Sequence, residues 1–319
     1  MNIVFSDLDH ADHDIERDIL ASAGFDAPML ACRSEQELIE QLTDVDIALN
    51  QYAPFTRRVF EALPRLKLIV RYGVGVNNID LEAATDAGVQ VCNVPDYGTS
   101  EVADHALALT LALTRKLVPM NRACREGRWN YVEAIPLRRQ STQTVGLIGL
   151  GRIGRLYARK LGALGFSVIG YDAFYRPGAK DGTDYIESVE LDSLYARADV
   201  VAVFCPLTED THHLVDKAAL AAMKPGVCLV NTSRGGIIDE SSLAEALASG
   251  HVAGAGLDTT EQEPLESDSP LWAQPSCLIT PHMAWYSDDA AAELKRKVAE
   301  EAVRFASGEA VCWPVNRLA

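Results

Sequence analysis

Three side chains that can act together on a carbonyl group follow three successive apolar segments of the chain. Arg234 follows CLVNTS, Glu263 lies a few residues after GLD, and His282 follows CLITP. Arginine binds a carboxylate through a planar and permanently charged fork, and histidine transfers protons near neutral pH. A neighbouring glutamate orients the imidazole and favours its protonated form. Together these residue types predict a site that holds a substrate carboxylate and protonates a developing alkoxide.

A glycine-rich segment between a predicted strand and a predicted helix indicates a dinucleotide site. The strand TVGLIG runs into GLGRIG, with glycines at 149, 151 and 154, and the helical segment RLYARKLGALG follows. In this setting Gly149 permits the tight turn, Gly151 lets the pyrophosphate approach the backbone, and Gly154 lets helix and strand pack closely. The next strand, FSVIGYD, ends in Asp172, a carboxylate that would bind the adenine-side ribose and repel the extra phosphate of NADP. The segment predicts NAD(H), while Arg176 nearby leaves NADP open.

The elements that position these residues alternate between short apolar runs and helical patterns. The runs are rich in Val, Ile and Leu without polar alternation, as in strands buried on both faces of a parallel sheet. The order predicts an α/β protein built from doubly wound, Rossmann-like parallel sheets, in which polar groups collect at the carboxyl ends of the strands. The predicted strands are Ile3–Ser6, Ile47–Asn50, Leu68–Arg71, Val89–Cys92, Thr144–Gly149, Ser167–Tyr171, Val200–Cys205, Cys228–Asn231, Gly254–Asp258 and Leu278–Thr280. Predicted helices include Glu35–Leu42, Leu81–Ala87, Gly154–Leu164, Glu190–Arg197 and Glu240–Ala248.

The length of 319 residues predicts two domains, since a single hydrophobic core stops growing at ~250–300 residues. The division is marked by Glu101–Leu117, a long helical segment that is apolar around most of its circumference. Such a helix must be covered by a domain interface or by a partner subunit. A continuous strand–helix series runs from there to about residue 288, and the first hundred residues form a shorter series. The C-terminal helix, about Asp288–Ser307, could close onto either series.

The composition excludes several classes of partner. A net charge of −16 repels nucleic acid and anionic membranes, and no apolar run approaches the ~20 residues of a membrane span. The seven cysteines are scattered and never form a CxxC pair, which argues against a disulfide framework and a structural zinc site. The first residues, MNIVFSDLDHADHDIERD, do not have the pattern of a signal peptide. We therefore expect a cytoplasmic protein without a metal site.

The segments GLGRIG, NTSRGGIIDESSLAEAL, LDTTEQEP and TPH resemble the D-2-hydroxyacid dehydrogenase family over essentially the whole chain. The resemblance implies that Arg234, Glu263 and His282 are catalytic and that Asp258 holds the nicotinamide carboxamide. It also implies a homodimer formed through the helix at 101–117. The expected domains are a flavodoxin-like substrate-binding domain, 1–98 plus 289–319, and an NAD-binding Rossmann domain, 99–288, inserted in it. The predicted cofactor contacts are Gly149, Gly151, Arg152, Ile153, Gly154, Asp172, Pro206, Thr232 and Asp258.

Within the family, the segments PHMAWYS, RYGVGVNNID and NVPDYGTSEVADHALAL are most similar to the C-terminal-binding protein branch. That similarity implies that Arg71 contacts the substrate carboxylate, that the amides of Val74 and Gly75 complete its site, and that Trp285 walls the pocket. A tight loop after a strand does expose N–H groups, and two arginines would supply the positive charge that the chain as a whole lacks. An ion pair at a domain interface is the alternative for Arg71, and plain packing is the alternative for Trp285.

These features predict an NAD-dependent enzyme that interconverts a small anionic 2-hydroxy acid and its 2-keto acid. Two other functions stay open: an NAD(H)-gated binding module like the corepressors of the same branch, and a phosphoglycerate dehydrogenase. The full Arg–Glu–His set and the absence of a long tail favour the enzyme over the binding module, and no phosphate pocket or regulatory domain marks the third. The chain departs from the family pattern at Asn77, at Thr259–Thr260 and at Ser233, which leaves the identity of the substrate open.

Overall fold

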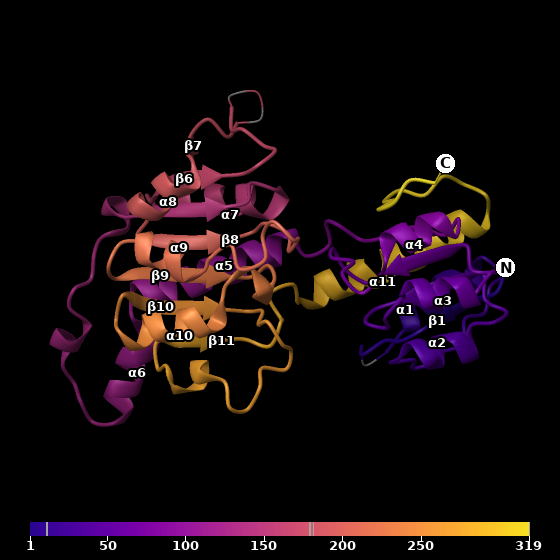
Figure 1. Cartoon of the computed structure of the whole chain (residues 1–319), viewed down its shortest axis with the longest axis horizontal. Coiled ribbons are helices and arrows are strands. Elements are labelled where there is room, and N and C mark those ends of the chain that lie inside the picture. The colour runs from indigo at the N-terminus through magenta and orange to yellow at the C-terminus, as the bar shows by residue number, and fades with distance from the viewer. Residues whose placement is uncertain (11, 179, 181, 319) are drawn as a thin grey trace. The chain divides into compact units, whose positions relative to one another are not determined.

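The computed structural model describes residues 1–10, 12–178, 180 and 182–318. The chain divides into two compact units, one made of Met1–Gly98 and Ser287–Ala319 and the other of Thr99–Tyr286. Each unit contains one parallel sheet (Figure 1). The predicted α/β class with two Rossmann-like parallel sheets is therefore confirmed. Among the described residues, no helix is both long enough and apolar enough to cross a membrane.

The unit Thr99–Tyr286 is built on a seven-stranded parallel sheet of order β11-β10-β9-β8-β5-β6-β7. Chain order reverses between the neighbours β5 and β8, which is the switch point where doubly wound sheets bind their ligands. The strands are β5 (Thr144–Ile148), β6 (Ser167–Tyr171), β7 (Glu187–Ser188), β8 (Val200–Val203), β9 (Val227–Asn231), β10 (Val252–Leu257) and β11 (Cys277–Ile279). The helices are α5 (Thr99–Thr114), α6 (Leu117–Arg125), α7 (Arg152–Ala163), α8 (Leu191–Arg197), α9 (Lys217–Ala222) and α10 (Glu240–Ala248).

Two hydrophobic layers hold helices on both faces of this sheet. On one face, Leu194 of α8, Leu220 of α9 and Leu243 of α10 pack on buried strand residues. On the other face, Ala106 of α5 and Tyr157 of α7 do the same. The strands therefore bury both of their faces, which explains why their sequences lack polar alternation. Their carboxyl ends are left as the free edge where polar side chains can gather.

The other unit has a four-stranded parallel sheet of order β1-β2-β3-β4. Its strands are β1 (Ile3–Phe5), β2 (Ile47–Asn50), β3 (Leu68–Arg71) and β4 (Gln90–Cys92), and its helices are α1 (Asp14–Ser22), α2 (Glu35–Gln41), α3 (Arg57–Ala62), α4 (Leu81–Asp86) and α11 (Asp288–Ala306). A parallel bridge between Phe5 and Met29 adds an outer position beside β1. With that position, the order becomes the 2-1-3-4-5 of flavodoxin-like sheets. Helix α11 packs against α1 and contacts β2 and β3, so the C-terminal helix belongs to this unit.

The long helix predicted at Glu101–Leu117 is wrong at its C-terminal end. Helix α5 stops at Thr114, and a separate helix, α6, begins at Leu117. Between them Lys116 has a left-handed backbone with φ of 51°, a conformation that ends an α-helix. Much of the apolar surface of α5 packs inside its own unit, against α7, β9 and β10, so a partner subunit is not needed to bury that surface.

Candidate active site

The loops that follow β9 and β10 touch each other backbone to backbone, which brings two predicted catalytic segments together. A Cβ atom on Gly235 would lie only 1.9 Å from the carbonyl carbon of Thr260. No side chain fits there, so glycine directly after Arg234 lets the arginine loop lie against the loop that leads to Glu263. The pattern NTSRGG predicts a functional role for its arginine, but the close approach at Gly235 cannot be inferred from the sequence.

Glu263 and His282 form the central pair of the site. The Nδ1 atom of His282 lies 2.7 Å from Oε2 of Glu263, and both side chains are partly exposed to solvent. The other carboxylate oxygen of Glu263 accepts a hydrogen bond from the amide of Thr260 at 3.2 Å. Since Nδ1 is engaged by the carboxylate, Nε2 is the ring nitrogen available for proton transfer.

The carboxylate of Glu263 is held in its charged form. Partial burial raises the pKa of Glu263. The hydrogen bond with His282 and the charges of His282 and Arg234 outweigh that effect and lower the pKa of Glu263 below its usual value. Glu263 therefore stays ionised throughout the neutral range. Arg234 lies close enough for its positive charge to contribute to the lowered pKa of Glu263. Its Nη1 atom donates a hydrogen bond to the carbonyl of Ser233 at 2.7 Å. The structure brings Arg234, Glu263 and His282 to the same sheet edge.

Asp258 is the first residue after β10. Its side chain is buried, and its carboxylate accepts hydrogen bonds from the hydroxyl of Thr280 and from the amides of Met283 and Ala284, at 2.5, 3.0 and 2.8 Å. Its backbone carbonyl accepts from the amide of His282 at 2.8 Å. In this structure Asp258 therefore holds the turn that carries His282. A hydrogen bond from its carboxylate to the nicotinamide carboxamide stays a prediction.

A reciprocal contact that the sequence did not reveal fixes the loop around Glu263. The amide of Glu240, at the start of α10, donates to the carboxylate of Glu261 at 3.0 Å, and the amide of Glu261 donates to the carboxylate of Glu240 at 2.6 Å. His213 adds a ring contact of 3.1 Å to Glu261. Both glutamates lie in segments quoted for the family resemblance, Glu240 in NTSRGGIIDESSLAEAL and Glu261 in LDTTEQEP. Two exchanged hydrogen bonds between distant segments nevertheless leave no periodic signal in a sequence.

The glycine loop has the geometry that a dinucleotide requires. A Cβ on Gly149 would lie 2.6 Å from the backbone nitrogen of Cys205, and one on Gly154 would lie 2.2 Å from the carbonyl oxygen of Gly149. These glycines allow the loop, α7 and the strand to pack as closely as they do. Gly151 differs, because nothing lies within 4 Å of the position of its Cβ. The open space beside Gly151, at the start of α7, is where the helix N-terminus would receive the pyrophosphate of the cofactor.

The residue Asp172 lies directly after β6, as the prediction placed it. Its carboxylate accepts hydrogen bonds from the amides of Leu150, Phe174 and Tyr175. Partial burial raises the pKa of Asp172, but the hydrogen bonds from these three amides outweigh that effect, so the pKa is lowered below its usual value. An ionised carboxylate offers about four acceptor positions, so one stays available to a ribose hydroxyl. Arg176 donates to the backbone carbonyl of Asp172, so a positive charge does lie next to this carboxylate.

Gly151 has open space where a side chain would lie, whereas Gly149 and Gly154 are tightly packed. Gly151 can therefore be replaced to test the cofactor site. We expect Gly151→Ala to raise the Kd for NADH about 10-fold or more, because a methyl group would enter the space of the pyrophosphate and overpacking costs ~1–3 kcal/mol. Since Gly151 is the N-cap of α7, its replacement should lower the free energy of unfolding by no more than ~1 kcal/mol. Fluorescence titration with NADH measures the first quantity. Gly162→Ala, in the same helix and also in open space, should bind NADH normally. Equal affinities in the two variants would show that Gly151 does not face the cofactor.

The remaining predicted cofactor contacts lie at the same edge of the sheet. Pro206 is exposed after β8, with its carbonyl bonded to the hydroxyl of Thr211 at 2.6 Å. A hollow of about 450 Å³ lies next to it, lined by Leu207, Thr208, Glu209 and His212. Thr232 is buried directly after β9, and its hydroxyl has no hydrogen-bond partner within the described part of the chain. Arg152 and Ile153 are the first two residues of α7.

Arg71, in the unit with the four-stranded sheet, lies at the end of β3 beside its own glycine loop. A Cβ on Gly73 would lie 1.9 Å from Nη1 of Arg71, so the guanidinium lies against the loop backbone. Gly73 has a positive φ of 126°, which favours glycine. The hydrogen bonds found among the described residues include none donated by the amides of Val74 and Gly75. Two unused amides beside an arginine are suited to an anion.

Trp285 lies in the turn after β11, in the unit Thr99–Tyr286. It is partly buried and makes an edge-to-face contact with Tyr286, with ring centroids 5.5 Å apart. Its expected role as a pocket wall stays a prediction. Among the described residues, no group of three or more His, Cys, Asp or Glu side chains is placed to hold a metal ion.

Comparisons with known proteins agree with this geometry. The model of the family "D-isomer specific 2-hydroxyacid dehydrogenase, NAD binding domain" matches residues 107–284. The chain is 37% identical over 255 residues to a hydroxypyruvate reductase of Blautia hydrogenotrophica, covering 78% of this chain and 79% of that protein. It is 42% identical over 258 residues to a D-3-phosphoglycerate dehydrogenase of Mycobacterium tuberculosis, covering 81% of this chain but only 48% of that protein. A D-lactate dehydrogenase from Aquifex aeolicus, solved with NAD and lactic acid, superposes with a TM-score of 0.87 at 26% identity, over 97% of this chain and 96% of that chain.

Proposed function

Because the chain belongs to the D-isomer specific 2-hydroxyacid dehydrogenase family, we propose that it reduces a small 2-keto acid to the D-2-hydroxy acid and catalyses the reverse reaction. It is an NAD-dependent oxidoreductase that acts on the CH–OH group of 2-hydroxy acids. The observation that carries the proposal is the 2.7 Å contact between Glu263 and His282 beside Arg234. The exact substrate is open.

Each residue of the set has one role in the proposed reaction. Bound NADH supplies the hydride that reaches the keto carbon. The guanidinium of Arg234 holds the substrate carboxylate and stabilises the negative charge that develops on the carbonyl oxygen. His282 donates a proton from Nε2 to that oxygen, and Glu263 orients the ring and stabilises its protonated form. We propose that Arg71, with the amides of Val74 and Gly75, also binds the carboxylate, and that Trp285 lines the pocket.

The configuration of the product tests the proposed reaction. Incubation of the protein with NADH and pyruvate or hydroxypyruvate should yield the D-2-hydroxy acid alone, as measured by chiral chromatography. The family model and the NAD-bound relative both support this outcome. Formation of the L-enantiomer, or of both enantiomers, would contradict it.

A phosphoglycerate dehydrogenase is the second candidate, because of the 42% identity to the mycobacterial enzyme. The chain spans about half the length of that relative, so the activity of the whole relative does not transfer. Rates with phosphohydroxypyruvate and hydroxypyruvate separate the candidates: a kcat/KM that is higher with the phosphorylated acid would favour the second. The finer similarity to C-terminal-binding proteins rests on the three segments PHMAWYS, RYGVGVNNID and NVPDYGTSEVADHALAL. We therefore rank a corepressor-like role below the enzyme.

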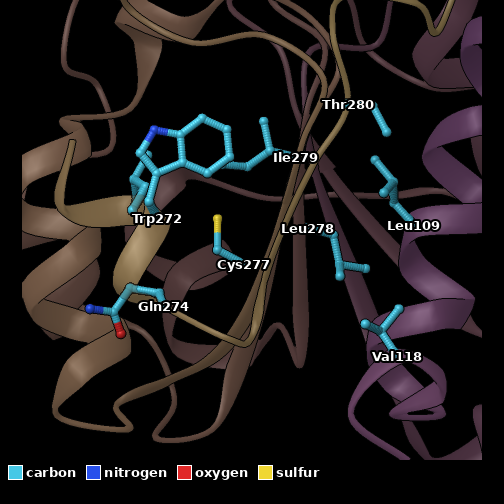
Figure 2. Close-up of a pocket in the computed structure, with 9 residues that line it drawn as sticks. Leu109, Val118, Trp272, Gln274, Cys277, Leu278, Ile279 and Thr280 are labelled. Atoms are coloured by element: carbon cyan, nitrogen blue, oxygen red, sulfur yellow. The ribbon is translucent and has the colours of Figure 1, made fainter. Parts of the chain in front are cut away.

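We propose that the protein is a cytoplasmic homodimer, with a contact surface that extends beyond the predicted helix. Large apolar side chains are exposed in the segment 117–137, including Trp129 at 89% and Tyr131 at 80% of their full exposure. A groove of about 470 Å³ lies beside the edge strand β11 (Figure 2). Leu109 and Val118 lie on one side of that strand and Trp272 on the other. A second copy of the chain could cover both the segment and the groove, since patches of this kind are unusual on monomers.

The oligomeric state is tested by light scattering after size-exclusion chromatography. The wild type should have twice the mass of the chain, and the double variant Trp129→Ser/Tyr131→Ser should dissociate at micromolar concentration. Phe174→Ser removes an aromatic side chain that is equally exposed but lies outside the segment, and it should leave the mass unchanged. A wild type with the mass of a single chain would rule out the dimer.

The preference for NAD over NADP is expected to depend on Asp172. We expect Asp172→Ala to lower the ratio of kcat/KM with NADH to kcat/KM with NADPH by about 10- to 100-fold. The reason is the loss of a charge-assisted contact to the ribose, worth ~1.5–3 kcal/mol, and of the repulsion of the extra phosphate. Asp172→Asn removes the charge but keeps a hydrogen-bond acceptor for the loop amides, and it separates the two effects. A wild type that already prefers NADPH would show that Arg176 dominates this position.

A further inference from the structure

A chain of hydrogen bonds connects helix α5 to the turn that carries His282. The Nε2 atom of His105, in α5, lies 3.0 Å from the hydroxyl oxygen of Thr280. That hydroxyl donates to Oδ1 of Asp258 at 2.5 Å. Figure 2 shows Thr280 next to Leu109 of α5. All of these residues belong to the unit Thr99–Tyr286, and neither His105 nor Thr280 was expected to take part in the site.

The directions of these hydrogen bonds follow from simple proton counting. A hydroxyl group has a single proton. The oxygen Oδ1 of Asp258 already accepts a hydrogen bond from the amide of Met283 at 3.0 Å. It therefore acts as an acceptor, and the hydroxyl of Thr280 donates its hydrogen bond to it. The hydroxyl can then only accept from the ring of His105, which places a proton on Nε2. This nitrogen also lies 3.6 Å from the same carboxylate oxygen.

The turn after β11 requires such support. His282 has a φ of 51°, a left-handed conformation that is unfavourable for a residue with a Cβ. The amide of His282 donates to the backbone carbonyl of Asp258. The next two amides, of Met283 and Ala284, donate to the carboxylate of Asp258. The side chain of Asp258 is only 1% exposed, so the groups packed around it determine its orientation. The orientation of this carboxylate therefore fixes the backbone that directs the ring of His282.

We propose that His105 and Thr280 are positioning residues for the proton donor. They orient the buried carboxylate of Asp258, and Asp258 holds His282 in the conformation from which its ring contacts Glu263 and reaches the substrate. Neither residue touches the substrate. The proposal rests on the role of His282 in the proposed function, and it adds to that role a support that comes from a helix on one face of the sheet.

Matched pairs of variants test the proposal. Thr280→Val removes the hydroxyl at nearly constant shape, and Thr280→Ser keeps it. His105→Leu removes the ring N–H, and His105→Gln keeps an N–H donor at a similar reach. We expect the valine and leucine variants to lower kcat about 10- to 100-fold, the usual effect of a misplaced catalytic group. The serine and glutamine variants should regain most of the activity. The combination of valine and leucine should be no worse than the poorer single variant, because both act through the same carboxylate.

Amide hydrogen exchange gives a measurement that does not depend on turnover. In the valine and leucine variants, without substrate, the amides of Met283 and Ala284 should exchange faster than in the wild type, while amides in α10 should not change. Wild-type exchange in Thr280→Val, or a lower kcat with unchanged exchange, would overturn the proposal. A lower melting temperature with full kcat would do the same, because it would indicate a packing contact. If the wild type reduces no 2-keto acid, the proposed function fails, and the exchange rates alone decide whether this chain holds the turn.

Discussion

The His282→Ala variant is expected to reduce 2-keto acids ~10²–10⁴ times more slowly than the wild type, which is the usual contribution of a general acid. Alanine removes the imidazole that would protonate the developing alkoxide, and the neighbouring Glu263, whose pKa is lowered below its usual value, is a poor replacement donor. NADH binding should change little, because the glycine loop and Asp172 follow β5 and β6, and three other strands of the sheet lie between these and β11. Steady-state kcat and the Kd for NADH, measured on the same preparations, test both statements.

Two comparisons make the interpretation of this variant specific. The ring of His251 contacts the carbonyl oxygen of Leu220 at 2.8 Å. His251 directly precedes β10, so it lies at the amino ends of the strands, opposite to the carboxyl ends that carry the candidate site. His251→Ala should therefore keep the wild-type kcat. Glu263→Gln should lower kcat by a smaller factor than His282→Ala, because it keeps a hydrogen-bonding group beside the ring but removes the charge that stabilises its protonated form. A His282→Ala variant with normal turnover would exclude His282 as the proton donor.

The second large effect is expected for Arg234→Ala. Loss of a charge-assisted contact to the substrate carboxylate removes ~1.5–3 kcal/mol, which corresponds to a decrease in kcat/KM of about 10- to 150-fold. The decrease should appear mainly as a higher KM for the keto acid. Arg234→Lys keeps the charge but loses the planar fork, so it should recover only part of the loss.

The control for Arg234 is another arginine of the same unit. Arg197 forms an exposed pair with Glu187 of β7, away from the ends of β9, β10 and β11. Arg197→Ala removes the same charge and should leave kcat/KM unchanged. If Arg234→Ala and Arg197→Ala behave alike, Arg234 does not bind the substrate.

The strands of both sheets could be predicted to within a few residues because they are buried on two faces, and such strands are continuous apolar runs. The strand β7 was missed because it has two exposed polar residues, Glu187 and Ser188, at the edge of the sheet. The end of the long helix was predicted wrongly for a different reason. The apolar pattern of α5 continues into α6, and the break at Lys116 is a backbone event on a residue that normally favours helix.

The candidate site was predictable where its residues follow strands, and less so where distant backbone segments meet. Arg234, Glu263 and His282 follow β9, β10 and β11, and the parallel order of the strands brings their ends together. The contact of Gly235 with Thr260 depends on the distance between two loops, which no spacing within the sequence encodes. His105 was hidden in an apolar helix, and its only signal was a single polar ring among alanines and leucines. The hydrogen bonds that Asp258 makes could not be predicted from the sequence, because they join two segments at distances that only the fold determines.

The most direct test of the proposed reductase activity is the oxidation of NADH, followed by its near-ultraviolet absorbance, with a panel of 2-keto acids and with Arg234→Ala as the comparison. The panel contains glyoxylate, pyruvate, hydroxypyruvate, phosphohydroxypyruvate, phenylpyruvate and a keto acid with a thioether side chain. We predict turnover of at least one of these acids by the wild type and a decrease in kcat/KM of about 10-fold or more in the variant. Tight binding of NADH without turnover of any acid, or equal rates for the wild type and the variant, would contradict the proposed reductase.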